Sequence, residues 1–139
     1  EAFIEGTIRS LARDKWEAIS RRLGEIVKGA ELSWGVGAEY RSDLLSPAVS
    51  NDAALAGFAV ETAREIGLAA GPSIPGMWGE DFALYQERIR GVFLNFGMGG
   101  PASVHSPFFA ADPALLAPAA EYLSRLAEKA LARLGSGQG

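Results

Sequence analysis

The sequence predicts a mixed α/β and α+β chain that is organised in two parts. Runs rich in β-branched and aromatic residues are separated by runs whose apolar residues recur every three or four positions, so strands and helices follow one another. The order is strand, helix and strand in the first part, then helix, short helix, strand and helix in the second. Each part has too few strands to bury a core by itself, and we expect both to be pieces of larger sheets.

The first part consists of two predicted strands on either side of one helix. Residues 2–9 carry several side chains that favour a strand. Apolar residues at helical spacing predict a helix over residues 14–28, with Gly29 just past its end. Large side chains then alternate with small or charged ones over residues 31–40, which indicates a half-buried strand.

The second part begins after a connection that contains serine and proline. Asn51 is a good helix cap, and the apolar spacing that follows predicts a helix over residues 52–66, ended by Gly67. A short helix is expected over residues 80–88, and a compact strand over residues 92–96.

The last helix begins at a strong start signal. Asp112 is expected to cap it and Pro113 to occupy its first position, where a missing N–H costs nothing. Pro118 lies inside this helix and should bend it or delay its start. Apolar residues at helical spacing predict its buried face, formed by Leu116, Leu123, Leu126, Ala130, Leu131 and Leu134. The last residues, 135–139, should form a loose tail.

The composition excludes several classes of function. The 139 residues carry a formal net charge of −4, which gives no electrostatic reason to expect a nucleic-acid or anionic-membrane partner. No apolar run approaches the roughly 20 residues of a membrane-spanning helix. The absence of cysteine excludes disulfides and thiolate catalysis and says little more about the compartment. We expect a cytoplasmic protein. The chain enters in mid-strand at Glu1, which suggests a fragment, a processed product or an incomplete sequence.

The single histidine lies in "SVHSPFF" (103–109), between a "GMGG" run (97–100) and the last helix. A lone histidine is commonly a loop residue bonded to backbone or water. Imidazole can also bind a metal or titrate near neutral pH, and His105 follows a predicted buried strand, where α/β proteins often carry binding residues. A catalytic metal needs about three protein ligands, so carboxylates would be the only further ligands within this chain.

Two adjacent carboxylates, Glu80 and Asp81, stand at the start of the short predicted helix. Acidic residues in a first turn complement the helix dipole, which is a sufficient structural reason for them. The preceding "PSIPGMWG" is less ordinary, because large apolar residues between glycines suggest a pocket wall or a packed loop. Arg9 ends the first strand and by itself would be a surface arginine. The "GMGG" run lacks the Lys-Ser/Thr of a nucleotide-binding loop.

Taken in order, several motifs resemble one family. "EGTIRS" (5–10), "SPAVSND" (46–52), "GMWGEDFALYQERIRGVFLNFGMGG" (76–100) and "VHSPFF" (104–109) are similar to the C-terminal portion of the metal-dependent amidohydrolases that include aminoacylase and hippurate hydrolase, a metallopeptidase family with a lid domain. The resemblance covers nearly all of the chain. "GEDF" and the "G-x-G…H-x-P-x-F" stretch are its most specific pieces.

The resemblance implies a domain organisation and a metal centre. The family has an α/β catalytic domain with two divalent ions, which would be Zn, Mn, Co or Ni. A smaller α+β lid domain interrupts the catalytic domain and carries the interface of a homodimer. By this comparison residues 1–45 match the second half of the lid, and residues 46–139 match the closing part of the catalytic domain.

The resemblance also implies roles for single residues. His105 matches the family's last metal ligand, and Glu80 and Asp81 match residues near the substrate pocket. Arg9 matches an arginine that binds a substrate carboxylate in some relatives. Three glycines match the loop before the histidine, namely Gly97, Gly99 and Gly100. No catalytic residue is expected in this chain, because the family's general-base glutamate and its other metal ligands lie upstream.

The implied reaction is hydrolysis of the amide bond of N-acyl amino acids, such as hippurate, by metal-activated water. One departure is that family members often carry Asp soon after the His-x-Pro-x-Phe stretch, where this chain has Phe109 and Ala110. The chain alone is expected to be inactive. The alternative is a non-catalytic dimerisation or binding module derived from the same family.

Overall fold

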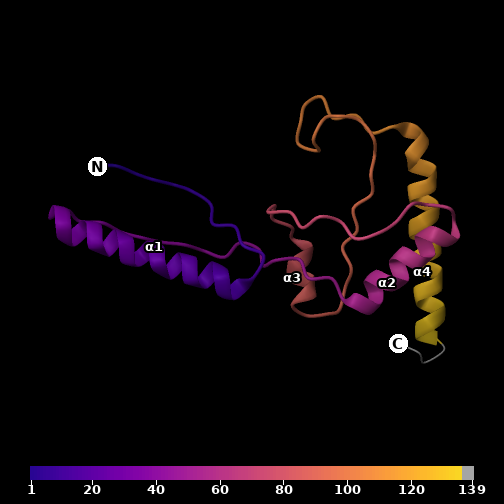
Figure 1. Cartoon of the computed structure of the whole chain (residues 1–139), viewed down its shortest axis with the longest axis horizontal. Coiled ribbons are helices and arrows are strands. Elements are labelled where there is room, and N and C mark those ends of the chain that lie inside the picture. Colours follow the sequence, from indigo (N-terminus) through magenta and orange to yellow (C-terminus); the bar gives the residue numbers. More distant parts are fainter. Residues whose placement is uncertain (136–139) are drawn as a thin grey trace. The chain divides into compact units, whose positions relative to one another are not determined.

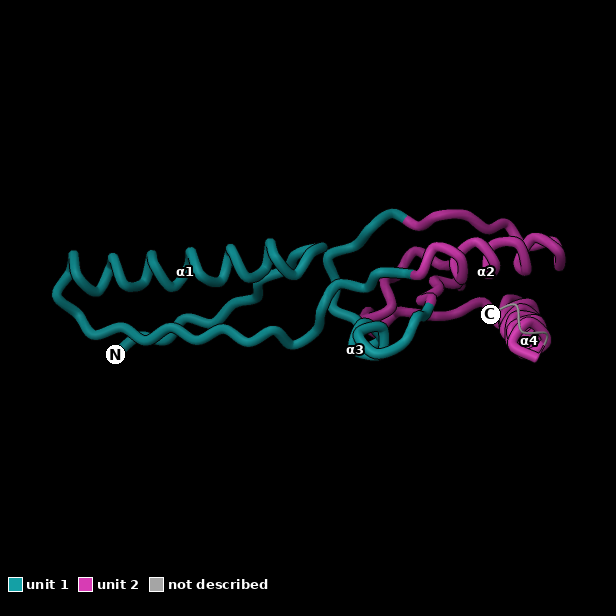
Figure 2. The backbone as a smooth tube through the Cα atoms, turned by 90° about the horizontal axis from the view of Figure 1, so that it is seen from below, with its two compact units in different colours: residues 1–51, 74–91 teal, residues 52–73, 92–139 magenta. Residues whose placement is uncertain are grey.

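The computed structural model describes residues 1–135, and these form two compact units. Unit 1 consists of Glu1–Asn51 and Ile74–Gly91, and unit 2 consists of Asp52–Ser73 and the chain from Val92 onward (Figure 2). Figure 1 shows the helices α1 (Arg13–Trp34), α2 (Ala53–Glu65), α3 (Phe82–Gln86) and α4 (Leu116–Gly135), and the 3₁₀ helix η1 (Pro113–Leu115) directly precedes α4. These two units do not correspond to the predicted lid (residues 1–45) and catalytic domain (residues 46–139) of a larger protein. That assignment stays a prediction.

Residues 1–135 form helices and extended segments but no β-ladder. The predicted strands at 2–9, 31–40 and 92–96 are therefore not present as strands. A strand is stabilised by hydrogen bonds to a neighbouring strand, and an extended segment without such a neighbour remains irregular backbone. The sheets of the expected α/β and α+β class are thus a prediction, whereas its helices are present. Within the same residues no helix combines the length and the apolarity needed to cross a bilayer.

Helix α1 is longer than the sequence predicts. It continues through Glu31 to Trp34, so the first residues of the predicted strand 31–40 are helical. The helix ends at Gly35, whose φ of 65° is left-handed and whose N–H donates to the Glu31 carbonyl at 3.0 Å. Gly29 is an interior helical residue and does not end α1. An ion pair of 2.6 Å between Lys28 and Glu31 supports this last part of the helix.

Within unit 1 the chain returns alongside α1 (Figure 2), and two small residues of the helix, Ser20 and Gly24, face the returning segment. The Ser20 hydroxyl is hydrogen-bonded to the Ser42 hydroxyl at 2.5 Å, and it accepts a longer bond of 3.4 Å from the Tyr40 hydroxyl. A Cβ at Gly24 would lie 3.3 Å from the Tyr40 ring. The missing side chain at Gly24 therefore lets the tyrosine lie directly on the helix.

Helix α2 provides most of the core of unit 2. The cap is Asp52 rather than the predicted Asn51, because the Asp52 carboxylate accepts the Leu55 N–H at 3.0 Å. The helix ends at Glu65, one residue before the predicted end, and Gly67 follows with a φ of 81°. Among the described residues of unit 2, the buried ones are Phe58, Ala59, Thr62, Ala63 and Tyr122.

Helix α4 begins as predicted but faces the core with other residues. Asp112 accepts the Ala114 N–H at 2.9 Å, and a 3₁₀ turn precedes the α-helix, so Pro118 falls in its first turn and the delayed start is confirmed. The predicted buried face is wrong for four leucines that are more than half exposed, Leu116, Leu123, Leu131 and Leu134. Both sides of α4 carry Leu and Ala, so the spacing of apolar residues does not predict which side faces the core. The side that carries Tyr122 does. Of the predicted tail, Gly135 is the last residue of α4, and 136–139 lie outside the described residues.

Candidate metal and substrate site

The loop that carries the histidine is closed at its base by the backbone. The N–H of Asp112 donates to the Met98 carbonyl at 3.1 Å, so the two ends of the loop meet. Gly99 and Gly100 have φ values of 71° and 76°, a region that other residues rarely adopt. A Cβ at Gly100 would also lie 3.4 Å from the Ala110 carbonyl oxygen. Two of the three predicted loop glycines are thus required by the conformation.

Gly97 is different, because its φ is not in the left-handed region and a Cβ there would meet nothing within 4 Å. No structural requirement for glycine is visible at this position within residues 1–135. Its assignment to the site rests on the sequence alone and stays a prediction.

His105 lies in a tight turn inside this loop. The N–H of Ser106 donates to the Ser103 carbonyl at 2.9 Å, which closes one turn around the histidine. A second turn follows at once, in which the Ser106 carbonyl accepts the N–H of Phe109 and its hydroxyl accepts the N–H of Phe108. Backbone bonds on both sides therefore fix where the His105 Cα lies.

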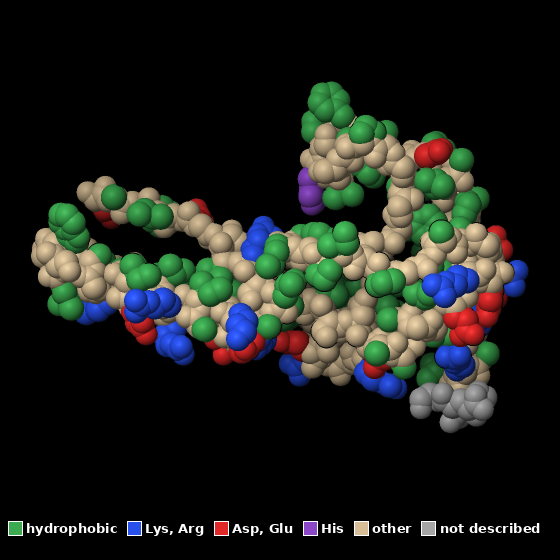
Figure 3. Space-filling model, viewed as in Figure 1, with side chains coloured by type: hydrophobic (Ala, Val, Ile, Leu, Met, Phe, Trp, Pro, Cys, Tyr) green, Lys and Arg blue, Asp and Glu red, His purple; other side chains and the backbone are tan. Residues whose placement is uncertain are grey.

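The His105 imidazole is exposed on unit 2 (Figure 3). Its nitrogens have no hydrogen bond or ion pair within the part of the chain that the structure describes. The same residues contain no group of three or more His, Asp or Glu side chains that could hold a metal ion. The role of His105 as a metal ligand therefore stays a prediction.

The two adjacent carboxylates lie in unit 1, at the start of α3. Glu80 is half-buried, and its Oε1 accepts the N–H of Phe82 at 3.2 Å, which satisfies one free donor of the first turn. The side chain of Asp81 is exposed at the N-cap position and makes no capping bond. Glu80 thus stabilises the start of the helix, which was the alternative reason for an acidic pair here. Asp81 does not, and its side chain is available for other contacts.

Arg9 contacts the loop that leads to these carboxylates. Its Nη1 donates to the Met77 carbonyl at 2.7 Å, although 68 residues separate the two in sequence. Met77 and Trp78 are themselves more than half exposed, so this loop forms no closed pocket wall within unit 1. The structure brings Arg9 to the segment just before Glu80. His105 and the glycine loop belong to unit 2, which is described by itself.

Two polar residues that sequence reasoning missed hold α3 in unit 1. The Ser46 hydroxyl donates to the Glu80 carbonyl at 2.7 Å. The Gln86 amide bonds to three backbone or side-chain groups, at Ser50, Asn51 and Gly91. A single serine or a glutamine at the end of a five-residue helix has no periodic signature, so spacing could not have found either residue.

Comparison with known proteins decides the family. Residues 7–129 match the model of peptidase family M20/M25/M40, which is most of the chain. The chain belongs to this family. The matched range contains Arg9, Glu80, Asp81 and His105, so all the predicted site residues lie in family sequence.

Relatives within this M20 family agree with the match. The chain is 32% identical over 127 residues to the N-acetylcysteine deacetylase of Bacillus subtilis (strain 168), covering 91% of this chain and 33% of that protein. It is 31% identical over 127 residues to the N-acetyldiaminopimelate deacetylase of Streptococcus gordonii, covering 89% of this chain and 33% of the relative. The chain thus spans about a third of the length of the curated relatives it matches.

A solved structure is also similar. The YXEP protein of Bacillus subtilis, described as a dinuclear metal-binding peptidase from the M20 family, matches with a TM-score of 0.76 and 31% sequence identity. The match covers 83% of this chain and 32% of that protein. Similarity at this level supports assignment of the chain to part of an M20 fold.

Proposed function

We propose that the whole protein carrying these residues is a metal-dependent amidohydrolase that acts on N-acyl amino acids. The observation that carries this proposal is the M20 match over residues 7–129, because it includes an exposed imidazole that has no polar partner among the described residues, on a loop held by its own backbone bonds. Pre-organisation of the loop favours ligation, since the position of the His105 Cα is set before a metal arrives.

In this proposal His105 is one ligand of a pair of divalent ions, and it binds as the neutral imidazole. The dinuclear description of the similar Bacillus subtilis structure supports a pair. When bound, the metal lowers the pKa of a water molecule and polarises the scissile carbonyl. The remaining ligands and the general base come from other parts of the whole protein, and the ions are Zn, Mn, Co or Ni.

Arg9, Glu80 and Asp81 are proposed to act on the substrate. Arginine has five N–H donors, and the bond to the Met77 carbonyl uses one of them, so the Arg9 guanidinium keeps donors for the carboxylate of an amino acid. Asp81 is exposed and can accept a bond from a polar substrate group. Both relatives named above are deacetylases, which favours an acetyl group over the larger benzoyl group of hippurate.

A second candidate is a dimerisation or binding module. Phe3 and Ile4 lie in an extended segment of unit 1 and are 87% and 93% exposed. An extended segment with unpaired backbone and exposed apolar side chains can pair with another chain. We therefore propose a homodimer formed through residues 1–45, and this homodimer is compatible with either function.

The test uses the whole protein, stripped of metal by chelation and then loaded with zinc, manganese, cobalt or nickel. Release of the amino acid is measured with N-acetylated amino acids and with hippurate as the comparison. We expect turnover only after metal is restored, and faster turnover of acetylated substrates. A metal-loaded protein that dimerises but hydrolyses none of them would contradict the amidohydrolase and leave the binding module.

A further inference from the structure

Gln86, the last residue of α3, ties this helix to two separate segments of unit 1. Its Nε2 donates to the Asn51 Oδ1 and to the Gly91 carbonyl, both at 3.2 Å. Its Oε1 accepts the backbone N–H of Ser50 at 3.0 Å. One amide thus ties the end of α3 to two segments that lie 35 residues before it and five residues after it.

The partners of Gln86 have a particular place in the chain. Asn51 is the last residue of unit 1 before the chain enters unit 2, and Gly91 is the last residue of unit 1 before it enters unit 2 again. The second crossing leads through Val92 to the glycine loop and His105. Gln86 therefore holds together the two points from which the chain leaves unit 1.

Helix α3 depends on such attachments. It has five residues, and a helix that short is not stable in isolation. Ser46 holds its start through the Glu80 carbonyl, and Gln86 holds its end. The Phe82 ring lies against Gly91, since a Cβ there would approach Phe82 to 3.0 Å. Removing the attachment at the end would free the short helix to move with the carboxylates that precede it.

We propose that Gln86 is a positioning residue that fixes Glu80 and Asp81 in the substrate site. The inference rests on the proposed function, because it needs those carboxylates to act on a substrate. The amide is matched to this task. The amide uses two N–H donors for the Asn51 and Gly91 oxygens and one oxygen acceptor for the Ser50 N–H. A glutamate at this position would lose both donated bonds, and a methionine would lose all three bonds.

The first test is a double-mutant cycle in the metal-loaded whole protein. Gln86→Met keeps the length of the side chain and removes its bonds. We expect it to lower kcat/KM on an N-acetyl amino acid by roughly 10-fold to 100-fold, since small misplacements at a reacting site have effects of this size. Arg88→Met is the matched control, because Arg88 is an exposed neighbour whose side chain makes no hydrogen bond or ion pair within residues 1–135, and it should leave kcat/KM unchanged.

The cycle is completed with Glu80→Gln. If Gln86 acts through Glu80, the two changes are not additive. In the Glu80→Gln background, adding Gln86→Met should then lower kcat/KM by less than about threefold. Equal losses in both backgrounds would overturn the positioning role and leave a purely structural one. A Glu80→Gln variant with undiminished activity would also overturn it, because there would be no acting carboxylate to position.

The second test does not depend on activity. Amide hydrogen exchange of the whole protein is followed in peptides that contain Ser50 and Ala83. Gln86→Met should speed exchange in both, because it removes the acceptor of the Ser50 N–H and loosens α3, whereas Arg88→Met should not. Unchanged exchange would overturn the attachment. Faster exchange in Gln86→Met, together with a metal-loaded wild type that has no amidase activity, would support the attachment while refuting the proposed function.

Discussion

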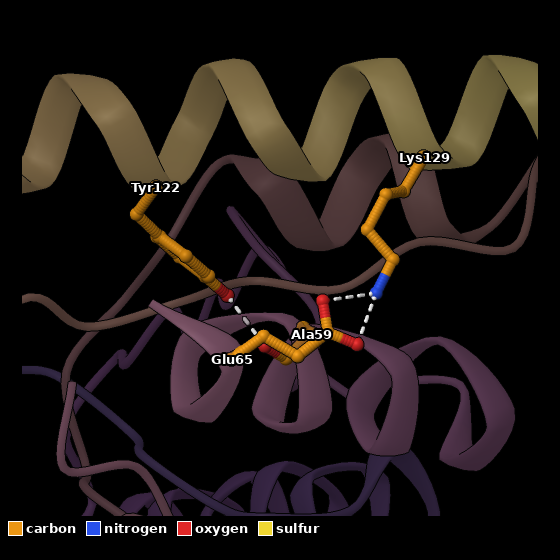
Figure 4. A network of polar contacts seen from close by, with 4 residues as sticks. All are labelled: Ala59, Glu65, Tyr122 and Lys129. Carbon is orange, nitrogen blue, oxygen red and sulfur yellow. Dashed lines mark hydrogen bonds and ion pairs between the residues drawn. The ribbon is translucent and has the colours of Figure 1, made fainter. Parts of the chain in front are cut away.

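Tyr122 on α4 donates its phenol hydrogen to the carbonyl oxygen of Ala59 on α2 over 3.0 Å (Figure 4). Two turns further along α4, the Lys129 ammonium bonds to both carboxylate oxygens of Glu65 at 2.7 Å. The first contact is buried and the second is exposed. The buried bond should therefore contribute more to unit 2, since exposed ion pairs contribute little.

Replacement of Tyr122 by phenylalanine tests the buried contact. The Tyr122→Phe change removes the hydroxyl and keeps the ring, so the packing stays and the bond to Ala59 is lost. We expect the free energy of unfolding of the whole protein to fall by about 1 kcal/mol. Denaturant unfolding measures this value. Tyr85→Phe is the control, because the Tyr85 side chain is 64% exposed and should change stability little.

The same tyrosine gives a pH dependence. Burial raises the pKa of Tyr122 above its usual value of 10.0. The unfolded chain then ionises first as the pH rises, so the stabilisation is complete below about pH 10 and is lost as the pH rises through the folded pKa. Unfolding measured from pH 8 to pH 11 should show this loss in the wild type. Tyr122→Phe should lose less stability over this pH range, because it has no phenol to ionise. An identical alkaline loss of stability in both proteins would refute a raised pKa of Tyr122.

Thr62 offers a change in the opposite direction. It is 1% exposed, and its hydroxyl has no hydrogen-bond partner within residues 1–135. A buried hydroxyl without a partner is destabilising, and valine has nearly the same shape. Thr62→Val should therefore raise the free energy of unfolding by about 1 kcal/mol. A loss of stability would mean that the hydroxyl has a partner in the whole protein.

Two glycines of α1 are expected to respond with opposite signs. Gly29 is an interior helical residue with open space around it, so Gly29→Ala should stabilise the protein by about 0.5–1 kcal/mol. Gly35 has a φ of 65°, so Gly35→Ala should destabilise it by about 1 kcal/mol. Thermal unfolding of both variants locates the end of the helix. The reverse pair of signs would place that end at Gly29, as the sequence pattern suggested.

The helices were largely predictable because their signals are local. Spacing of apolar residues located α2 and α4, and the Asp112 cap with Pro118 predicted how α4 starts. Glycine was less informative, since it is tolerated inside a helix and also ends helices. Gly29 and Gly35 both fit the end of α1, and only the backbone conformation separates them.

Strands and buried faces depend on partners that a local pattern does not contain. Residues 2–9 and 92–96 have the composition of strands, yet no neighbouring strand completes a ladder within residues 1–135. Helix α4 has apolar residues on both sides, so their spacing could not predict that the side carrying Tyr122 faces the core. Features that depend on a partner, such as a strand pairing or the buried side of a helix, are for this reason difficult to predict from local sequence.

The candidate site was predictable where chemistry is carried by rare residues. His105 is unique in the chain, and Glu80–Asp81 belongs to a recognisable motif. Ser46 and Gln86 were missed because they act through bonds to residues 34 to 36 positions away, and nothing in their own neighbourhood marks them.

The most direct test of the proposed metal site is the metal content of the whole protein with His105 replaced by glutamine. Glutamine has similar polarity and no imidazole nitrogen, so His105→Gln should retain less metal after dialysis and lower kcat/KM by at least about 100-fold. Ser103→Ala, in the same turn, should change neither. Metal content is measured by atomic emission, and turnover with an N-acetyl amino acid. Full metal content with full activity in His105→Gln would contradict the assignment of His105 as a metal ligand.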